Sequence, residues 1–327
     1  MFPRPAVATG HGVSDHYEVG REKIREFARA VQDAHPAHWD DSSAAALGHR
    51  GLVAPITFAS AVGSLAQRSQ MRAALDGYDP AHLLHVDQDI RCHRPVVAGD
   101  RLTHEVIVDS RRSTPSGDLI AVTTVIRDAM ANPVQTVHTT LAGRARELAP
   151  TVRAVAMLDL PAPAPAQASA RPAPRAVRSS SLATEANAGV AVPGLTVGRR
   201  FPRRVFRLSR GELVHYAGVS GDVNPIHWSD EAARHAGLRM VTAHGMLTMG
   251  LGATCLSEWL GVADGVVGYY VRFASPVPVA PDSLAEISIG GVVRSVDDAT
   301  GRATISLTAQ CDDVAVFAGA TATVRTR

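Results

Sequence analysis

Apolar and polar positions follow the same order of patterns twice along the chain. Each half begins with a stretch of helical period, over residues 22–32 and again over 210–217. Each half continues with a dense apolar run typical of a buried helix, over residues 54–75 and 246–260. Segments rich in Val, Ile and Thr then predict four strands per half: 84–92, 101–109, 119–127 and 134–141, then 265–273, 284–293, 303–311 and 315–324. A long helix with an antiparallel sheet in each half predicts an α+β fold.

A direct comparison of the halves indicates a duplication. A shift of 189 residues (222 − 33) places Asp33 on Asp222 without gaps, and it also places His38 on His227. This period is far longer than that of a solenoid repeat, so two homologous domains are the natural interpretation. A length of 327 residues suits two domains.

The segment between the halves has a different composition. Residues 161–174 consist mainly of alanine and proline, and three serines follow at 179–181. Such a segment cannot bury a core and predicts extended chain. We therefore expect four parts: an N-terminal tail over 1–14, a first domain over 15–148, a linker over 149–195 and a second domain over 196–327.

A candidate catalytic motif lies in the second half, within residues 216–227. Asp222 and His227 are five residues apart, too far for neighbours on one helix face. Pro225 fixes its own φ and disfavours helical geometry at Asn224, so the segment predicts a structured bend. Such a bend can aim both side chains at one point, where a carboxylate and an imidazole share acid and base work. Taken alone, the motif also fits an ordinary surface turn followed by a polar histidine.

A second motif over residues 243–250 favours the catalytic interpretation. Gly245 falls at the predicted start of the apolar helix, and the following residues are densely apolar. The first turn of a helix has free N–H groups at its positive end, which can hold an anionic oxygen. The enolate oxygen formed from a thioester carbonyl is such an anion.

The first half keeps the acid–base pair by spacing but changes its surroundings. Four positions of the second half are replaced in the first: Gly221, Asn224, His244 and Gly245 correspond to Gln32, His35, Pro55 and Ile56. Proline has no N–H, and an isoleucine side chain would crowd a ligand bound there. We therefore expect the first half to be non-catalytic. Whether Asp33 and His38 form a second active site stays open.

Both motifs resemble the signature of the MaoC-like, or R-specific, hydratase and dehydratase family of hotdog proteins. The likeness continues through residues 269–279 to the C-terminus. The first half resembles the partner subunit of the heterodimeric (3R)-hydroxyacyl-ACP dehydratase of type II fatty-acid synthesis, over residues 15–27, 51–58 and 139–144. The chain thus looks like both subunits fused. The resemblance implies two hotdog domains, each a long helix wrapped by antiparallel sheet, packed as an intramolecular pseudo-dimer; a further homodimer of the fused chain stays open.

The resemblance also implies an activity, that of a hydro-lyase. The reaction would be reversible dehydration of (3R)-3-hydroxyacyl thioesters, on ACP or CoA, to trans-2-enoyl thioesters in fatty-acid metabolism. His227 would take the C2 proton, Asp222 would assist loss of the 3-hydroxyl, Gly245 N–H would stabilise the carbonyl oxygen, and Asn224 would orient the pair. No cofactor or metal is implied. Two alternatives are a hotdog acyl thioesterase and a non-enzymatic module that binds acyl carrier protein. Acyl length, the choice between ACP and CoA, and the pathway stay open.

The composition of the chain limits the kinds of partner that we expect it to bind. A net charge of +2 gives no electrostatic case for nucleic acid. Arginine clusters could dock an acidic carrier protein, with Arg203, Arg204 and Arg207 as candidates. The three cysteines are scattered, and neither they nor the histidines show the spacing of a metal site. No apolar run has the length of a membrane span and the N-terminus lacks a signal-peptide core, so we expect a cytoplasmic protein.

Overall fold

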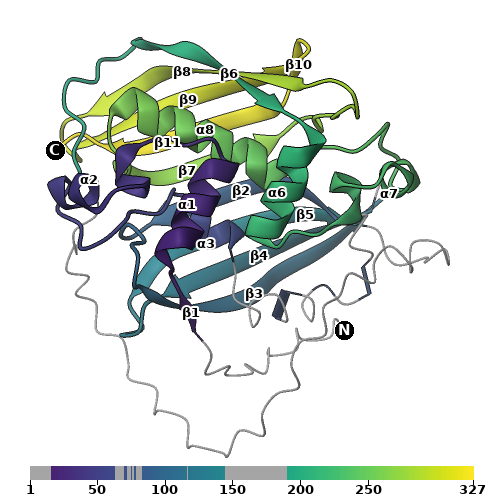
Figure 1. Ribbon diagram of the computed structural model, residues 1–327, viewed down its shortest axis with the longest axis horizontal. Coiled ribbons are helices and arrows are strands. Elements are labelled where there is room, and N and C mark those ends of the chain that lie inside the picture. Colours follow the sequence, from purple (N-terminus) through teal and green to yellow (C-terminus); the bar gives the residue numbers. More distant parts are fainter. Residues whose placement is uncertain are drawn as a thin grey trace, which may run out of the picture.

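The strands of both halves form one antiparallel sheet (Figure 1). The computed structural model describes residues 16–62, 70–71, 75, 77–78, 83–115, 117–143 and 190–327. The strand order is β1-β3-β4-β5-β2-β7-β11-β9-β8-β6, and β10 pairs with β9. The first half contributes β1 (Tyr17–Glu18), β2 (Leu84–Cys92), β3 (Arg101–Thr114), β4 (Gly117–Arg127) and β5 (Pro133–Gly143). The second half contributes β6 (Arg200–Leu208), β7 (Val266–Phe273), β8 (Ala285–Asp297), β9 (Arg302–Cys311), β10 (Val314–Ala315) and β11 (Phe317–Arg325).

The halves meet at the centre of this sheet. Strands β2 and β7 pair antiparallel, from Asp87 opposite Arg272 to Arg91 opposite Gly268. Backbone hydrogen bonds therefore continue from one half into the other, and the duplicated units form one body.

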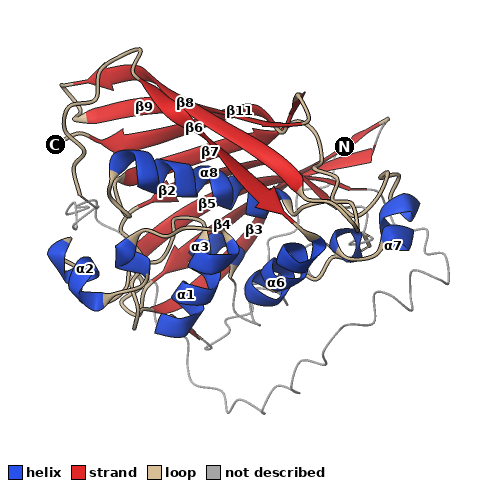
Figure 2. Cartoon of the chain, turned by 45° about the horizontal axis from the view of Figure 1, so that its top comes forward, coloured by secondary structure: helices blue, strands red, loops and turns tan. Residues whose placement is uncertain are grey.

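The helices lie on one side of the sheet (Figure 2). They are α1 (Arg21–Ala30), α2 (Asp41–Ala46), α3 (Phe58–Ala61), α6 (Arg210–Ser220), α7 (Asp230–His235) and α8 (Gly245–Leu260), with short 3₁₀ turns η1 (Pro36–His38) and η3 (Pro225–His227). Helix α8 is apolar all round, which requires burial on every side. Each of its residues from Met246 to Ser257 is buried, so α8 is the central helix of the second half.

Most predicted elements are confirmed, with ends that move by a few residues. The predicted helix over 246–260 begins one residue earlier, at Gly245. Ser229 caps α7 by accepting a bond from Ala232 N. Strand β6 was not predicted, because five arginines and prolines among its nine residues obscure the alternation of its buried positions Phe206 and Leu208.

The predicted helix over 54–75 is wrong at its start. Val53 forms a β-bridge with Val97, and α3 begins only at Phe58. The reason is Pro55, which has no N–H and disfavours helical geometry at Ala54. Residues 63–69 and 72–74 of that prediction lie outside the described residues.

The predicted linker ends in a packed segment. Its described part covers residues 190–195, where Val192 and Leu195 are buried in the main core. Val192 N–H also donates to Arg325 O at 2.8 Å, beside β11. The predicted tail over 1–14 and the linker before residue 190 lie outside the described residues.

Candidate active site

The predicted bend begins where α6 ends. Gly221 has φ +74°, a left-handed conformation that glycine adopts without strain, and it stops the helix. Asp222 follows directly. Its N–H donates to Ser220 Oγ at 3.2 Å, and its Oδ1 accepts from Asn224 N at 3.2 Å. These two contacts fix the start of the turn and the orientation of the carboxylate.

Asn224 and Pro225 then form the turn that carries His227. The Asn224 side chain caps η3 by accepting from Ile226 N at 3.3 Å, and Pro225 occupies the first position of η3. His227 is buried, and its Nδ1 lies 2.7 Å from Thr242 O. Because a carbonyl only accepts, Nδ1 must carry the hydrogen, which leaves Nε2 of the neutral ring as a base.

A third side chain, that of His244, lies close to the predicted pair Asp222 and His227. Asp222, His227 and His244 each place one polar atom within 4.8 Å of the other two. The His227 and His244 rings stack at 3.7 Å with 25° between their planes. His244 Nε2 donates to Asp222 O at 3.1 Å. We name Asp222, His227 and His244, together with Gly245, the active-site cluster.

The electrostatics of this cluster favour a carboxylate beside neutral imidazoles. Burial opposes ionisation of Asp222, but His244, His227, His85 and the Asn224 N–H outweigh it and hold the pKa of the carboxyl below its usual range. Burial lowers the pKa of His227, and it lowers that of His244 to about 3. Both rings are therefore neutral near pH 7, so His227 is ready to accept a proton.

The same three side chains are the metal-donor group found among the described residues. A metal ion requires lone pairs that converge on one point. Stacked rings instead direct their lone pairs in nearly parallel planes. The arrangement therefore suits hydrogen bonds to a small polar group better than chelation, in line with the expectation that no metal is bound.

Gly245 is the first residue of α8, as predicted. The N–H of a first helical residue has no acceptor within the helix and lies at the positive end of the dipole. A Cβ at this position would lie 3.5 Å from the Phe273 ring and 3.7 Å from His85 Cβ. A methyl group here would thus be in ordinary van der Waals contact with these two side chains. His85 belongs to β2, so both halves of the chain lie next to Gly245.

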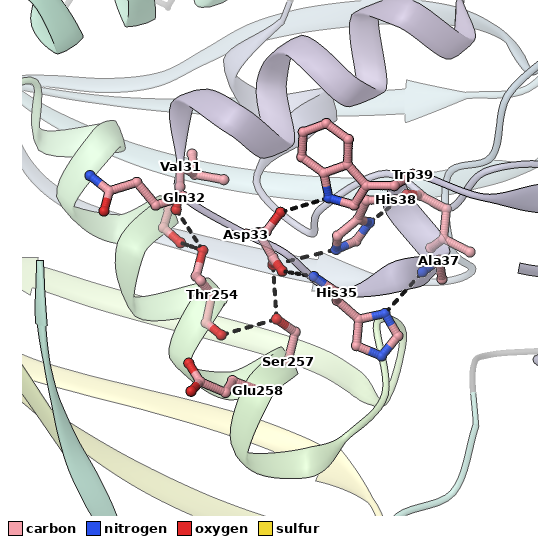
Figure 3. A network of polar contacts seen from close by, with 12 residues as sticks. Val31, Gln32, Asp33, His35, Ala37, His38, Trp39, Thr254, Ser257 and Glu258 are labelled. Atoms are coloured by element: carbon pink, nitrogen blue, oxygen red, sulfur yellow. Dashed lines mark hydrogen bonds and ion pairs between the residues drawn. The ribbon is translucent and has the colours of Figure 1, made fainter. Parts of the chain in front are cut away.

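The first half repeats the same turn around Asp33 and His38 (Figure 3). Gln32 has φ +55°, the left-handed conformation that Gly221 has in the second half. His35 N donates to Asp33 Oδ1 at 2.9 Å, as Asn224 N does to Asp222. His38 Nδ1 lies 2.6 Å from Val53 O, which matches the bond from His227 to Thr242. The two halves therefore share the backbone geometry of this turn.

The carboxylate of this first pair is occupied by protein groups. Ser257 Oγ of α8 donates to Asp33 Oδ2 at 2.8 Å, and His38 Nε2 lies 3.4 Å from the same oxygen (Figure 3). Asp33 is only 4% exposed. By contrast, no described residue donates to Asp222 Oδ2, and no ion pair within 4.0 Å joins Asp222 to His227 in the described part of the chain. Among the described residues, one oxygen of the Asp222 carboxylate is therefore without a donor, whereas both oxygens of the Asp33 carboxylate accept hydrogen bonds.

Comparison with known proteins identifies the family of this chain. Residues 7–137 match the family profile "FAS1-like, dehydratase domain region" and residues 192–311 match "MaoC like domain". The first half is 43% identical to a UPF0336 protein of Mycolicibacterium paratuberculosis over 133 residues, which covers 41% of this chain and 84% of that protein. A solved MaoC-like dehydratase is 40% identical, with a TM-score of 0.83, and the match covers 96% of this chain and 97% of that chain. The chain belongs to the MaoC-like dehydratase family.

The fold implied by the resemblance is confirmed as well. A conserved hypothetical protein of Mycobacterium tuberculosis, described as having a double hotdog fold, superposes with a TM-score of 0.61 over 95% of this chain and 94% of its own. Its identity of 15% supports the fold alone. This MaoC-like protein is therefore a double hotdog, two hotdog domains packed as a pseudo-dimer within one chain.

Sequence reasoning missed two members of the site. His244 was visible as the residue that Pro55 replaces in the first half, but it was not assigned a role. His85 gave no signal, because nothing in the sequence relates a strand of the first half to a turn some 140 residues later.

Proposed function

We propose that the second half catalyses the reversible dehydration of (3R)-3-hydroxyacyl thioesters to trans-2-enoyl thioesters. The observation that carries this proposal is the pairing of a neutral His227, with Nε2 as a base, and an Asp222 carboxylate whose Oδ2 is not taken by any described residue. Gly245 provides an N–H at the start of α8 next to them. A base, a polar holder for a hydroxyl and an oxyanion donor are the groups that this elimination needs.

The steps follow from these roles. His227 Nε2 removes a proton from C2, while the Gly245 N–H stabilises the negative charge that develops on the thioester carbonyl oxygen. The C2=C3 double bond forms as the C3–O bond breaks. The proton held by His227 passes to the departing hydroxyl, which leaves as water. The Asp222 carboxylate accepts a hydrogen bond from that hydroxyl and stabilises the transient imidazolium. Asn224 keeps Asp222 oriented through its N–H.

The first domain is proposed to be non-catalytic. Its carboxylate is filled by Ser257, and Pro55 and Ile56 replace the group that would bind the carbonyl oxygen. A cavity lined by Ile56, Val96 and Val266 lies at this first-half position and not at Asp222. Its mostly apolar lining supports the proposal that the first domain helps to shape the acyl-chain cavity.

The carrier of the acyl chain is proposed to be ACP or CoA. Two of the arginines predicted to dock an acidic carrier protein form ion pairs within the chain, Arg204 with Glu258 and Arg207 with Glu286. Arg203 donates to Ser288 and Gln310. A carrier would therefore have to compete for these groups. No helix in the described part of the chain is long and apolar enough to span a membrane; a cytoplasmic location is part of the proposal.

The test is an absorbance assay at the enoyl-thioester band with the purified full chain. Crotonyl and long-chain enoyl thioesters would each be offered on CoA and on acyl carrier protein, beside His227→Ala. We expect loss of the band through hydration with wild type, and a reduction of roughly a hundredfold or more in the variant. Release of free thiol without change at C2=C3 would instead indicate a thioesterase, and binding without turnover would indicate an acyl-carrier-binding module.

A further inference from the structure

His85 reaches the active-site cluster from the opposite half of the molecule. It lies near the start of β2, where the register with β5 shifts between His85 and Asp87. Such a bulge inserts a residue into the strand and re-aims the side chains beside it. The side chain is partly buried, and no described residue hydrogen-bonds its ring.

Three observations place this ring at the cluster. Its Cβ lies 3.7 Å from the point that a Gly245 Cβ would occupy. Its ring centroid lies 6.4 Å from that of Phe273, in an edge-to-face arrangement. Its charge state is linked to Asp222 and His227: burial lowers the pKa of His85, Asp222 opposes that shift and His227 adds to it. A neutral imidazole therefore lies next to Gly245, the residue whose N–H begins α8.

The duplicated half gives an internal comparison. The bridges Val53–Val97 and Thr242–Pro278 are equivalent, so strand residues after the central helices correspond by a shift of 181 (278 − 97). This shift places His85 on Val266. The site whose carboxylate is filled therefore has Val266 of the opposite half beside it, where the site with the available carboxylate has His85 of the opposite half.

We propose that His85 is a positioning residue of the second half's active site, which holds the thioester end of the substrate by a hydrogen bond from its ring. The proposal rests on the proposed dehydratase function and extends it, because the site is then incomplete without the first half. A neutral ring suits this role, since it donates one hydrogen bond without charging the cavity. Substrates lacking the carbonyl would gain nothing from it.

The test compares two substitutions that fill similar space. His85→Leu removes the donor, and His85→Gln keeps a neutral donor on a side chain of similar length. We expect His85→Leu to lower kcat/KM for crotonyl-CoA about tenfold, the effect of one lost hydrogen bond of about 1.4 kcal/mol. His85→Gln should recover most of that loss. His93→Leu is the matched control: this histidine follows β2, bonds Thr136 Oγ1 at 2.9 Å and should leave kcat/KM unchanged.

The outcomes separate this inference from the proposed function. Wild type without hydratase activity would overturn the proposed function itself. An active wild type with an inactive Asp222→Asn, beside a His85→Leu variant with unchanged kcat/KM, would overturn the role of His85 alone. Equal losses in His85→Leu and His85→Gln would also overturn it, because hydrogen bonding would then not be the property that matters. Thermal unfolding of each variant identifies any that fails to fold.

Discussion

The duplicated turns allow one substitution to be made twice in nearly identical backbone. Asp222→Asn and Asp33→Asn each replace a carboxylate by an amide of the same shape. At Asp222 the change removes the negative charge that stabilises the protonated His227, and it replaces an accepting oxygen by a donor. Acid–base groups of this kind contribute roughly a hundredfold to ten-thousandfold to rate. We expect Asp222→Asn to lower kcat by that factor with little change in stability.

At Asp33 we expect the opposite result, a loss of stability with little loss of activity. The carboxylate accepts bonds from His35 N and from Ser257 Oγ, and His38 lies 3.4 Å away. Hydrogen bonds to a buried charge are worth about 1.5 to 3 kcal/mol each. The asparagine keeps the first bond, and Ser257 can turn to accept from its amide, so the net loss is smaller. We expect about 1 to 2 kcal/mol of lost stability and kcat within about twofold of wild type.

Both quantities are measurable on the same preparations. Urea titration gives the free energy of unfolding, and hydration of crotonyl-CoA gives kcat. The reasoning predicts a crossed result, with activity lost in one variant and stability in the other. Comparable losses of kcat from both substitutions would refute it, because they would mean that Asp33 and His38 form a second working site.

Three further outcomes are expected. Gly245→Ala should fold normally, since its methyl group meets only ordinary contacts, yet lower kcat/KM roughly tenfold to a hundredfold by displacing the thioester in a steady-state assay. The proposed reaction needs ionised Asp222 and neutral His227, and the pKa values of both groups are lowered. The value of kcat/KM should therefore fall only as the pH drops below the usual histidine pKa of about 6.5. A loss of half of kcat/KM above that pH would contradict the assignment. Gly252→Ala should cost about 1 to 3 kcal/mol in thermal or urea unfolding, because its Cβ would lie 2.2 Å from Tyr269 Oη in a packed core.

The sequence predicted those parts of the site that depend on local chemistry. The bend between Asp222 and His227 follows from Gly221, Asn224 and Pro225, each of which restricts or frees its own backbone. The start of α8 at Gly245 follows from the apolar run after it. These features are set within a few residues, so the linear pattern contains them.

The parts that could not be predicted depend on long-range packing. Ser257 bonds Asp33 across 224 positions of sequence, and no periodicity relates the two. His85 enters the second site through a bulge in β2 and the pairing of β2 with β7. In each case the deciding partner lies far away along the chain.

Helix α8 contacts the two sites differently, and this explains why only the first carboxylate accepts a bond from Ser257. Its first residue, Gly245, presents an N–H to the second site, while Ser257, some 18 Å further along the helix, fills the carboxylate of the first. Thr254 adds a bond to Val31 O at 2.8 Å, so the far end of the helix is fixed to the turn around Asp33. The turn around Asp33 is thus an attachment point for the helix whose first residue, Gly245, belongs to the active-site cluster. Freeing the carboxylate of Asp33 would require removing the bond from Ser257, so an available carboxylate at the first site and this attachment of α8 exclude each other.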